Sequence, residues 1–206
     1  MGLSPAGFVR QVWKEGVLML KYIEVKSPQA IDYQQTINYC QLVFELSNYE
    51  VREITQKLLD SSSIAPNEMH YIVLKENDQP VGFAVYYYLT PIRLGYLDYL
   101  AVLPEFRCRG LGSKLYQQMV SELKVKHPDI EGLILEAKST DDDVEQRRDF
   151  FIKQGACELK LGSFQIPQQV MDSGLLLMYQ PLIKEAEMDS KLLIQAFQVL
   201  AKTLWH

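Results

Sequence analysis

The sequence has little of what would place it in several broad classes of protein. Its 206 residues include only three cysteines and three histidines, and acidic residues outnumber basic ones by 26 to 21. The resulting net charge of −5 has the wrong sign for binding a nucleic-acid backbone, so we expect no nucleic-acid partner. The same acidic balance is compatible with a small cationic substrate such as an amine.

The scarcity of cysteine and histidine also argues against a metal centre or a disulfide framework. Cys40, Cys108 and Cys157 are scattered, and none of them forms a CxxC pair or a metal-ligand spacing with a histidine. The acidic run 141–143 resembles a cation site, but adjacent side chains splay apart and Asp143 is placed to cap a following helix. We therefore expect no metal, and reduced thiols in a cytoplasmic protein.

Long apolar runs are absent as well. No segment reaches the roughly 18 apolar residues of a membrane-spanning helix. Arg10, Lys14 and Glu15 interrupt the first segment of the chain, which argues against a signal peptide, and Ala6 stands where the myristoylation pattern needs Ser or Thr. We therefore expect no membrane partner.

Hydrophobic periodicity predicts a mixed α/β chain. Apolar runs rich in β-branched residues predict strands over 17–25, 70–89, 94–103, 130–137, 156–163 and 174–181. The segment 70–89 contains two such runs on either side of a polar turn, which predicts a hairpin. Apolar residues at helical spacing predict helices over 6–15, 29–47, 49–60, 111–127, 143–154 and 185–204. This order predicts an α/β (α+β) fold with a mixed sheet.

The length favours one domain with an appendage over two independent domains. We expect an N-terminal extension over 1–17, the main domain over 18–182 and an amphipathic C-terminal helix over 183–206. In that helix an apolar stripe forms one face: Leu193, Phe197, Leu200 and Leu204. The stripe predicts packing either on the core or on a second copy of the chain, as a homodimer.

The segment Arg107-Cys108-Arg109-Gly110-Leu111-Gly112 joins a predicted strand to a predicted helix. Glycines let the backbone approach an anion closely, and the N–H groups and positive dipole of a helix start favour a phosphate. The two arginines add positive charge. Two other phosphate-binding patterns are excluded: Leu115 is too large for the last glycine of a dinucleotide fingerprint, and Gly112-Ser113-Lys114 has the wrong order for a Walker loop.

This R-x-x-G-x-G hexad, after a strand ending in Leu100-Ala101-Val102, resembles the coenzyme A pyrophosphate loop of the GNAT superfamily of N-acetyltransferases. The resemblance extends to "YLDYLAVLPEFR" and "LILEA…RRDFFIKQGA", covers about 18–182 and is strongest at 96–123. It implies a mostly antiparallel twisted sheet flanked by helices, with the C-terminal helix as an extra element. It also implies acetyl-CoA as cosubstrate.

The resemblance also implies which residues contact the cosubstrate. Three strand residues would bind the pantetheine arm through their backbone: Leu100, Ala101 and Val102. The loop and the start of the helix would bind the diphosphate: Arg107, Cys108, Arg109, Gly110, Leu111, Gly112 and Ser113.

In this family an amine attacks the thioester directly in a ternary complex, so the protein must accept a proton from the ammonium group. Asp98 is the favoured base or amine anchor, because it shares a strand face with Leu100 and Val102. Tyr96 could act through a water, and Glu136 on the next strand is a third candidate. Each has a structural alternative: orienting the substrate for Asp98, a core ring for Tyr96, and a lysine pair for Glu136.

The chain departs from the family pattern at Phe151, where many relatives have the tyrosine proposed to protonate the leaving thiolate. The loop "KSTDDDVEQRR" also lacks an asparagine that often contacts the cofactor. Neither change excludes catalysis, because a thiol of pKa about 8.5 leaves readily as thiolate. The resemblance implies an acetyl-CoA-dependent N-acetyltransferase acting on a primary amine of a small molecule. A peptide N-terminal acetyltransferase and a catalytically silent coenzyme A sensor stay open as alternatives.

Overall fold

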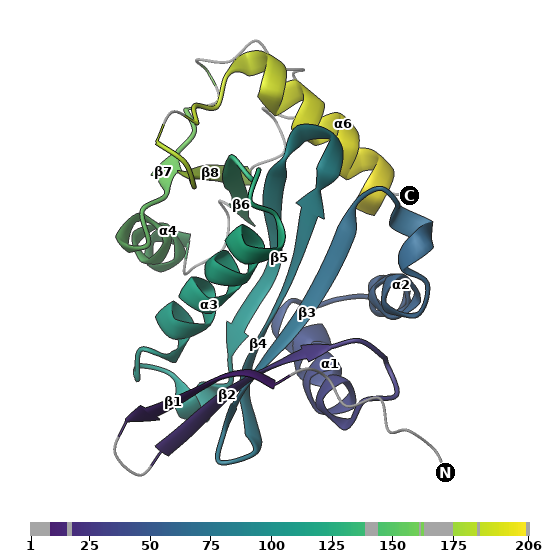
Figure 1. The fold of residues 1–206 in the computed structure, drawn as a ribbon, viewed down its shortest axis with the longest axis vertical. Helices are drawn as coiled ribbons and strands as arrows, with labels where there is room; N and C mark the ends of the chain where they lie inside the picture. The colour runs from purple at the N-terminus through teal and green to yellow at the C-terminus, as the bar shows by residue number, and fades with distance from the viewer. Residues whose placement is uncertain are drawn as a thin grey trace. The chain divides into compact units, whose positions relative to one another are not determined.

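A mixed sheet with flanking helices forms the fold in the computed structural model, which describes residues 9–15, 18–138, 144–160, 162, 175–184 and 186–204 (Figure 1). Within these residues the sheet has eight strands: β1 (Val9–Glu15), β2 (Leu18–Val25), β3 (Glu68–Glu76), β4 (Gln79–Leu89), β5 (Leu94–Val102), β6 (Gly132–Lys138), β7 (Cys157–Glu158) and β8 (Leu175–Pro181). The helices are α1 (Ile31–Val43), α2 (Asn48–Leu59), α3 (Leu111–Lys126), α4 (Val144–Lys153) and α6 (Ser190–Leu204). Three short 3₁₀ helices are η1 (Ser61–Ile64), η2 (Thr90–Ile92) and η3 (Pro104–Phe106).

The contacts of the chain divide it into two compact units, and each is described by itself. The first comprises residues 1–86 and 99–120, and the second residues 87–98 and 121–206. Strands β4 and β5 and helix α3 contribute residues to both units. The strand order is β1-β2-β3-β4-β5 in the first and β4-β5-β6-β8-β7 in the second.

In the first unit, β2 pairs antiparallel with both β1 and β3. Strand β3 is buried along most of its length, and α1 packs on it, with Thr36 Oγ1 lying 2.9 Å from the Tyr71 hydroxyl oxygen. Helix α2 begins with a capping box, in which Ser47 and Glu50 each satisfy the other's backbone N–H. Strand β4 follows β3 in the sheet, and its residues up to Tyr86 are almost entirely buried.

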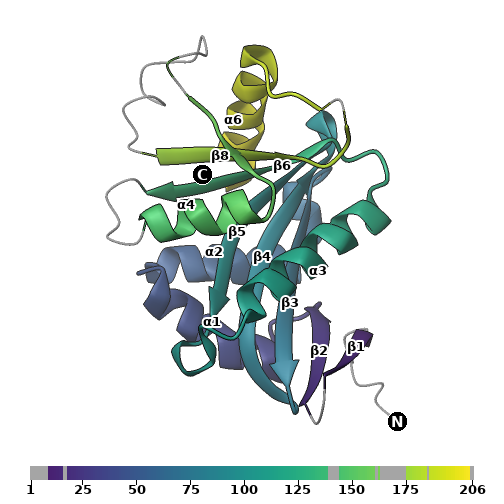
Figure 2. The same ribbon diagram turned by 90° about the vertical axis from the view of Figure 1, so that its left-hand side faces the viewer.

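In the second unit, β5 pairs parallel with β6 over Leu94–Leu97 and Gly132–Leu135, and β6 pairs antiparallel with β8. Helix α4 lies beside β6, as Figure 2 shows. Helix α6 contacts η2 and buries Leu193 and Leu200, so part of its apolar stripe is covered within a single chain. The homodimer stays a prediction.

The predicted fold class is confirmed, since a mixed, mostly antiparallel sheet carries flanking helices and an extra C-terminal helix. The helix predicted over 6–15 is wrong, because residues 9–15 form a strand whose backbone pairs with β2. The strand predicted over 156–163 is reduced to Cys157–Glu158 among its described residues. The last helix begins at Ser190 rather than at 185.

Three further features were considered in the sequence: the acidic run 141–143, the cysteines and long apolar segments. The expected cap at Asp143 and the acidic run 141–143 lie outside the described residues. Cys40, Cys108 and Cys157, all among the described residues, form no disulfide with one another. In the described part of the chain, no helix is both long enough and apolar enough to cross a membrane.

Candidate functional site

The glycine loop leaves β5 at Val102, passes through η3 and enters α3 at Leu111. Arg107 fastens the loop to the strand that precedes it, because its Nε donates a hydrogen bond to the Val102 carbonyl oxygen at 3.1 Å. Its Nη2 lies 3.4 Å from the Tyr39 hydroxyl of α1. Leu111 is buried and anchors the start of the helix in the core. The loop therefore has fixed ends within the first unit.

Two residues of the loop have left-handed backbone conformations, Cys108 with φ 58° and Gly110 with φ 72°. Glycine adopts this conformation without strain, whereas cysteine does so rarely. A Cβ atom added at Gly110 would meet no atom within 4 Å, so open space lies beside the backbone there. The combination allows a ligand to approach the Gly110 backbone directly.

The start of α3 presents backbone donors beside this space. The first intrahelical hydrogen bond runs from the Lys114 N–H to the Gly110 carbonyl oxygen at 3.2 Å. The N–H groups of Leu111 and Gly112 precede it and so have no intrahelical acceptor. Ser113 is half-buried in the same turn. N–H groups of this kind, at the positive end of a helix of 16 residues, form a favourable site for an anion.

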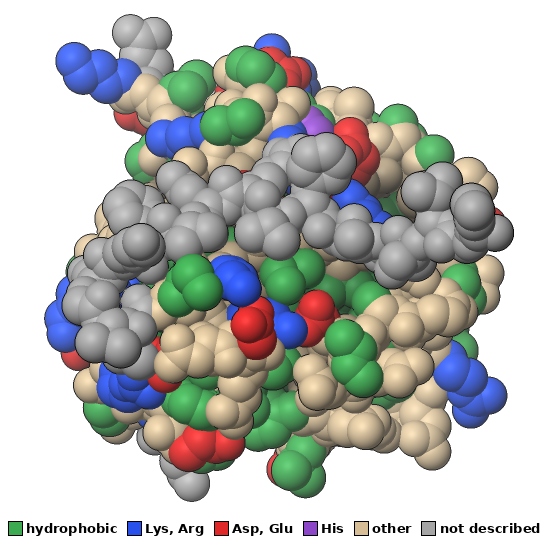
Figure 3. Space-filling model, turned by 60° about the horizontal axis from the view of Figure 1, so that its bottom comes forward, with side chains coloured by type: hydrophobic (Ala, Val, Ile, Leu, Met, Phe, Trp, Pro, Cys, Tyr) green, Lys and Arg blue, Asp and Glu red, His purple; other side chains and the backbone are tan. Residues whose placement is uncertain are grey.

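Arg109 is already paired within the protein. Its Nη2 lies 2.6 Å from Oε1 of Glu76, and its guanidinium carbon lies 5.7 Å from the centre of the Phe106 ring. The positive charge that Arg109 adds to the loop is therefore balanced by Glu76. On the face that Figure 3 shows, basic and acidic side chains likewise lie side by side.

The end of β5, where the resemblance places the pantetheine arm, is held closely against β4. The Leu103 N–H donates to the Val81 carbonyl oxygen at 2.9 Å. A Cβ at Gly82 would lie 2.8 Å from the Ala101 carbonyl oxygen, closer than side chains tolerate. Ala101 is buried, while Leu100 and Val102 are half-buried. Only glycine at position 82 permits this approach of the two strands.

We therefore expect Gly82→Ala to push the end of β5 away from β4. The contact is with backbone rather than with a flexible side chain, so the unfolding free energy should fall by about 1–3 kcal/mol. Urea unfolding followed by circular dichroism measures this change. Gly162→Ala is the control, because a Cβ there meets no atom within 4 Å. Equal stability of the two variants would contradict the close approach.

Tyr96 and Glu136, two of the three candidate catalytic residues, meet in the second unit. The Tyr96 hydroxyl donates to Oε1 of Glu136 at 2.7 Å. The parallel pairing of β5 and β6 ends at Leu97 and Leu135, immediately before Asp98 and Glu136. Tyr96 is 1% exposed and is therefore a core ring with a satisfied hydroxyl, as its structural alternative predicted.

The carboxyl group of Glu136 has an altered acidity. Burial raises its pKa, and the hydrogen bond from Tyr96 partly opposes this rise by stabilising the charged form. A carboxylate with a raised pKa is a better proton acceptor near neutral pH than an ordinary one. The partner of Glu136 is a tyrosine rather than the lysine of its structural alternative. Asp98 is half-buried at the next position of β5 after Leu97.

Helix α4 carries Phe150 and Phe151, which have no hydroxyl group. The Phe151 ring is 9% exposed and lies edge-on to the Phe150 ring, with centroids 5.2 Å apart. Both rings are packing residues here.

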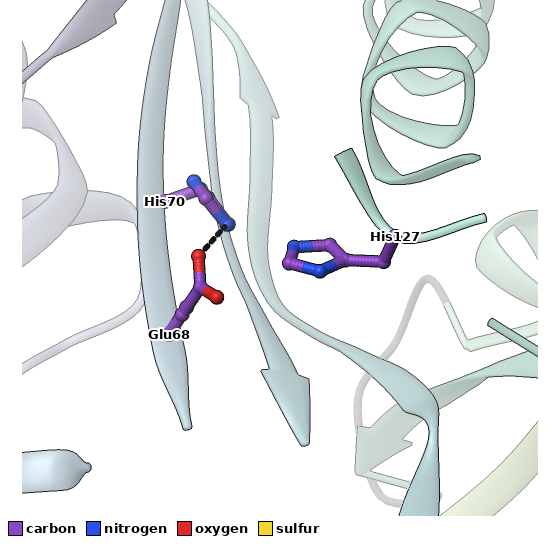
Figure 4. A group of neighbouring side chains, drawn as sticks. All are labelled: Glu68, His70 and His127. Carbon is purple, nitrogen blue, oxygen red and sulfur yellow. Dashed lines mark ion pairs between the residues drawn. The ribbon is translucent and has the colours of Figure 1, made fainter. Parts of the chain in front are cut away.

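A buried imidazole–carboxylate pair in the first unit was not predicted from the sequence. His70 Nδ1 lies 2.9 Å from Oε1 of Glu24, and each residue is 4% exposed. His70 Nε2 also lies 3.8 Å from Oε2 of Glu68, a contact that is an ion pair when the imidazole is protonated (Figure 4). His127, the third residue drawn there, belongs to the second unit and stacks on Tyr88 with centroids 3.7 Å apart. No motif signals the pair, because only the register of β2 and β3 brings its members together.

Comparison with known proteins identifies the family. Residues 35–155 match the model of the Acetyltransferase (GNAT) family. This match covers more than half of the chain, so the protein belongs to the GNAT acetyltransferase family. It includes the glycine loop and all three candidate catalytic residues. No significant match was found among curated proteins.

Solved structures share the fold at low sequence identity. An acetyltransferase of the GNAT family from Staphylococcus aureus is 18% identical with a TM-score of 0.57, over 80% of this chain and 99% of that one. GCN5 from Tetrahymena is 16% identical with a TM-score of 0.54, over 82% and 98%. N-acetylglutamate synthase from Neisseria gonorrhoeae, complexed with coenzyme A and N-acetyl-glutamate, is 14% identical with a TM-score of 0.55, over 83% and 36%. These likenesses support the fold assignment.

Proposed function

We propose that this protein transfers an acetyl group from acetyl-CoA to a primary amine of a small molecule. The observation that carries the proposal is the start of α3, where the left-handed Gly110 leaves open space beside N–H groups without intrahelical acceptors. Membership of the GNAT acetyltransferase family supports acyl transfer as the reaction.

Acetyl-CoA, the acetyl donor, would be bound through backbone groups of the protein at both of its ends. The N–H groups of Gly110, Leu111 and Gly112 suit the diphosphate, because successive backbone donors form an anion nest. Arg107, which is exposed in the same loop, would contribute a positive charge. The backbone of residues 100–102 suits the amide groups of pantetheine, since within the described residues the pairing of β5 with β6 ends at Leu97. This leaves β5 backbone groups for a ligand.

The reaction requires one proton acceptor and one leaving group. The amine nitrogen attacks the thioester carbon, the carbon–sulfur bond breaks, and coenzyme A leaves as a thiolate. The proton lost from the ammonium group goes to a carboxylate, and Glu136 is the better candidate because burial raises its pKa. Asp98, half-buried on β5, is the candidate anchor for the cationic amine, because a carboxylate forms strong hydrogen bonds with an ammonium group.

Thiol release tests this proposal. Purified protein is incubated with acetyl-CoA and a panel of small primary amines and peptides, and free coenzyme A is measured with a thiol reagent. Release that depends on a small amine supports the proposal. Release with peptide N-termini alone would replace it by peptide acetylation, and acetyl-CoA binding without release over the whole panel would replace it by a sensor role.

The hydrogen bond between Tyr96 and Glu136 gives a pH prediction. It stabilises the charged carboxylate, so Tyr96→Phe should raise the pKa of Glu136 further. The base acts in its charged form, and the rate therefore rises as the pH passes upward through this pKa. We expect the rising limb of kcat/KM against pH to move to higher pH in Tyr96→Phe. Tyr88→Phe, a change in a tyrosine that donates to Asp129, should leave the limb in place. A limb that is unmoved in Tyr96→Phe would exclude Glu136 as the base.

A further inference from the structure

The glycine loop is held in shape by a residue that lies far from it in the sequence. Arg109 stands between the two left-handed residues, Cys108 and Gly110. The backbone conformation of the loop therefore sets the position of the Arg109 side chain, and a fixed side chain in turn restrains the backbone. Its guanidinium group is bound to Glu76 at 2.6 Å, across 33 residues of sequence. The Phe106 ring lies against the same guanidinium group. The middle of the loop is thereby tied to β3.

Glu76 provides a firm attachment point. It is the last residue of β3, is 9% exposed, and pairs with Leu20 of β2. The following turn is also bound to β2, since the Asn77 N–H donates to the Met19 carbonyl oxygen at 3.1 Å. A carboxylate that is buried on such a strand end needs a charged partner, and Arg109 supplies it. The loop is fixed to the sheet rather than to another loop.

We propose that Glu76 is a positioning residue for the diphosphate of the donor, which it serves by holding Arg109. The proposal rests on the proposed function. Because Glu76 balances the charge of Arg109, the attraction for the diphosphate comes mainly from the N–H groups of Gly110–Gly112 and from Arg107. The ion pair keeps these N–H groups in their binding arrangement before the ligand arrives. Such preorganisation lowers the entropy cost of binding.

A role confined to the diphosphate makes a selective prediction. S-acetylpantetheine carries the same thioester and pantetheine arm as acetyl-CoA but has no diphosphate. Weakening the ion pair should therefore raise KM for acetyl-CoA and leave kcat/KM for S-acetylpantetheine unchanged. A merely structural defect would lower the activity with both donors.

The experiment compares Glu76→Gln with Asp78→Asn. Glutamine keeps the shape of Glu76 and removes its charge. Asp78→Asn removes the same charge from the same hairpin, where an exposed carboxylate pairs with Lys21 at 2.7 Å. We expect Glu76→Gln to weaken coenzyme A binding about tenfold, since hydrogen bonds between charged groups are the strong ones. Asp78→Asn should bind coenzyme A as the wild type does. Equal binding by Glu76→Gln and the wild type would overturn the proposal.

The variant Arg109→Gln tests whether Glu76 acts through Arg109. If it does, the double variant Glu76→Gln/Arg109→Gln should bind coenzyme A no more weakly than the weaker single variant. If the losses of coenzyme A affinity in the two single variants multiply in the double variant, the two residues act independently. That result would overturn the proposal. If Glu76→Gln does not fold, Arg109→Lys, which keeps the charge but loses the planar fork, should show the same donor selectivity. Absence of coenzyme A binding by the wild type would instead refute the proposed function.

Discussion

Gly110→Val is expected to weaken coenzyme A binding about 100-fold, a loss of about 2.7 kcal/mol. The valine side chain can weaken binding in either of two ways. The φ of 72° is strained for any residue with a Cβ and most of all for a β-branched one, so the loop should shift. If it does not shift, the valine methyl groups occupy the open space beside the Gly110 backbone, which a diphosphate would need. Titration calorimetry measures the affinity.

Gly155→Val is the matched control for this change. Gly155 follows α4 with φ 97°, so a valine there carries comparable backbone strain in the second unit, outside the loop. Each variant should lose about 1–2 kcal/mol of stability. Only Gly110→Val should lose affinity for coenzyme A. Equal losses of affinity in both variants would mean that strain alone, and not the loop, explains the effect.

Glu136→Gln is expected to lower kcat by about 10²- to 10⁴-fold while coenzyme A binding stays intact. Glutamine still accepts the hydrogen bond from Tyr96 but cannot take a proton. Stopped-flow or steady-state thiol release with the best amine of the panel measures the change. Asp98→Asn is the matched comparison, and for an amine anchor it should mainly raise KM for the amine. A large kcat loss in Asp98→Asn together with normal kcat in Glu136→Gln would reverse the two roles.

The Glu136→Gln variant should fold normally at neutral pH. Burial raises the folded-state pKa of Glu136 above its unfolded value, so the fold favours the neutral carboxyl group. The stability that this group contributes is present below the unfolded pKa and is lost as pH rises through the folded pKa. Because glutamine is neutral throughout, it should not destabilise the protein at neutral pH. Thermal unfolding at pH 5 and pH 8 checks this expectation.

Local patterns in the sequence predicted most of the fold. The α2 helix and the β3–β4 hairpin follow from apolar periodicity and from the polar turn at Asn77–Asp78, where both residues have positive φ. The strand over 9–15 did not follow, because its conformation depends on pairing with β2 and not on its own spacing. Local propensity is a weak guide to conformation where pairing with a distant strand determines it.

The candidate site could be predicted only where it depends on backbone groups. The loop was found because the R-x-x-G-x-G hexad at a predicted strand-to-helix junction resembles the coenzyme A loop of the GNAT family. The partners of Glu136 and Arg109 could not be found in this way. Tyr96 meets Glu136 across 40 residues, and Glu76 meets Arg109 across 33, through strand register and loop shape. The charge balance of Arg109 arises from such a contact, and the raised pKa of Glu136 arises from burial, which its contact with Tyr96 partly opposes. A linear sequence pattern contains neither.

The central claim is that the start of α3 binds the diphosphate of coenzyme A. Calorimetric titration of the wild-type protein with coenzyme A, and separately with S-acetylpantetheine, tests it most directly. We expect one-to-one binding of coenzyme A with Kd below about 1 mM, much tighter than S-acetylpantetheine, and loss of this difference in Gly110→Val. Equal affinity for the two compounds, or no binding of coenzyme A at millimolar concentration, would contradict the account.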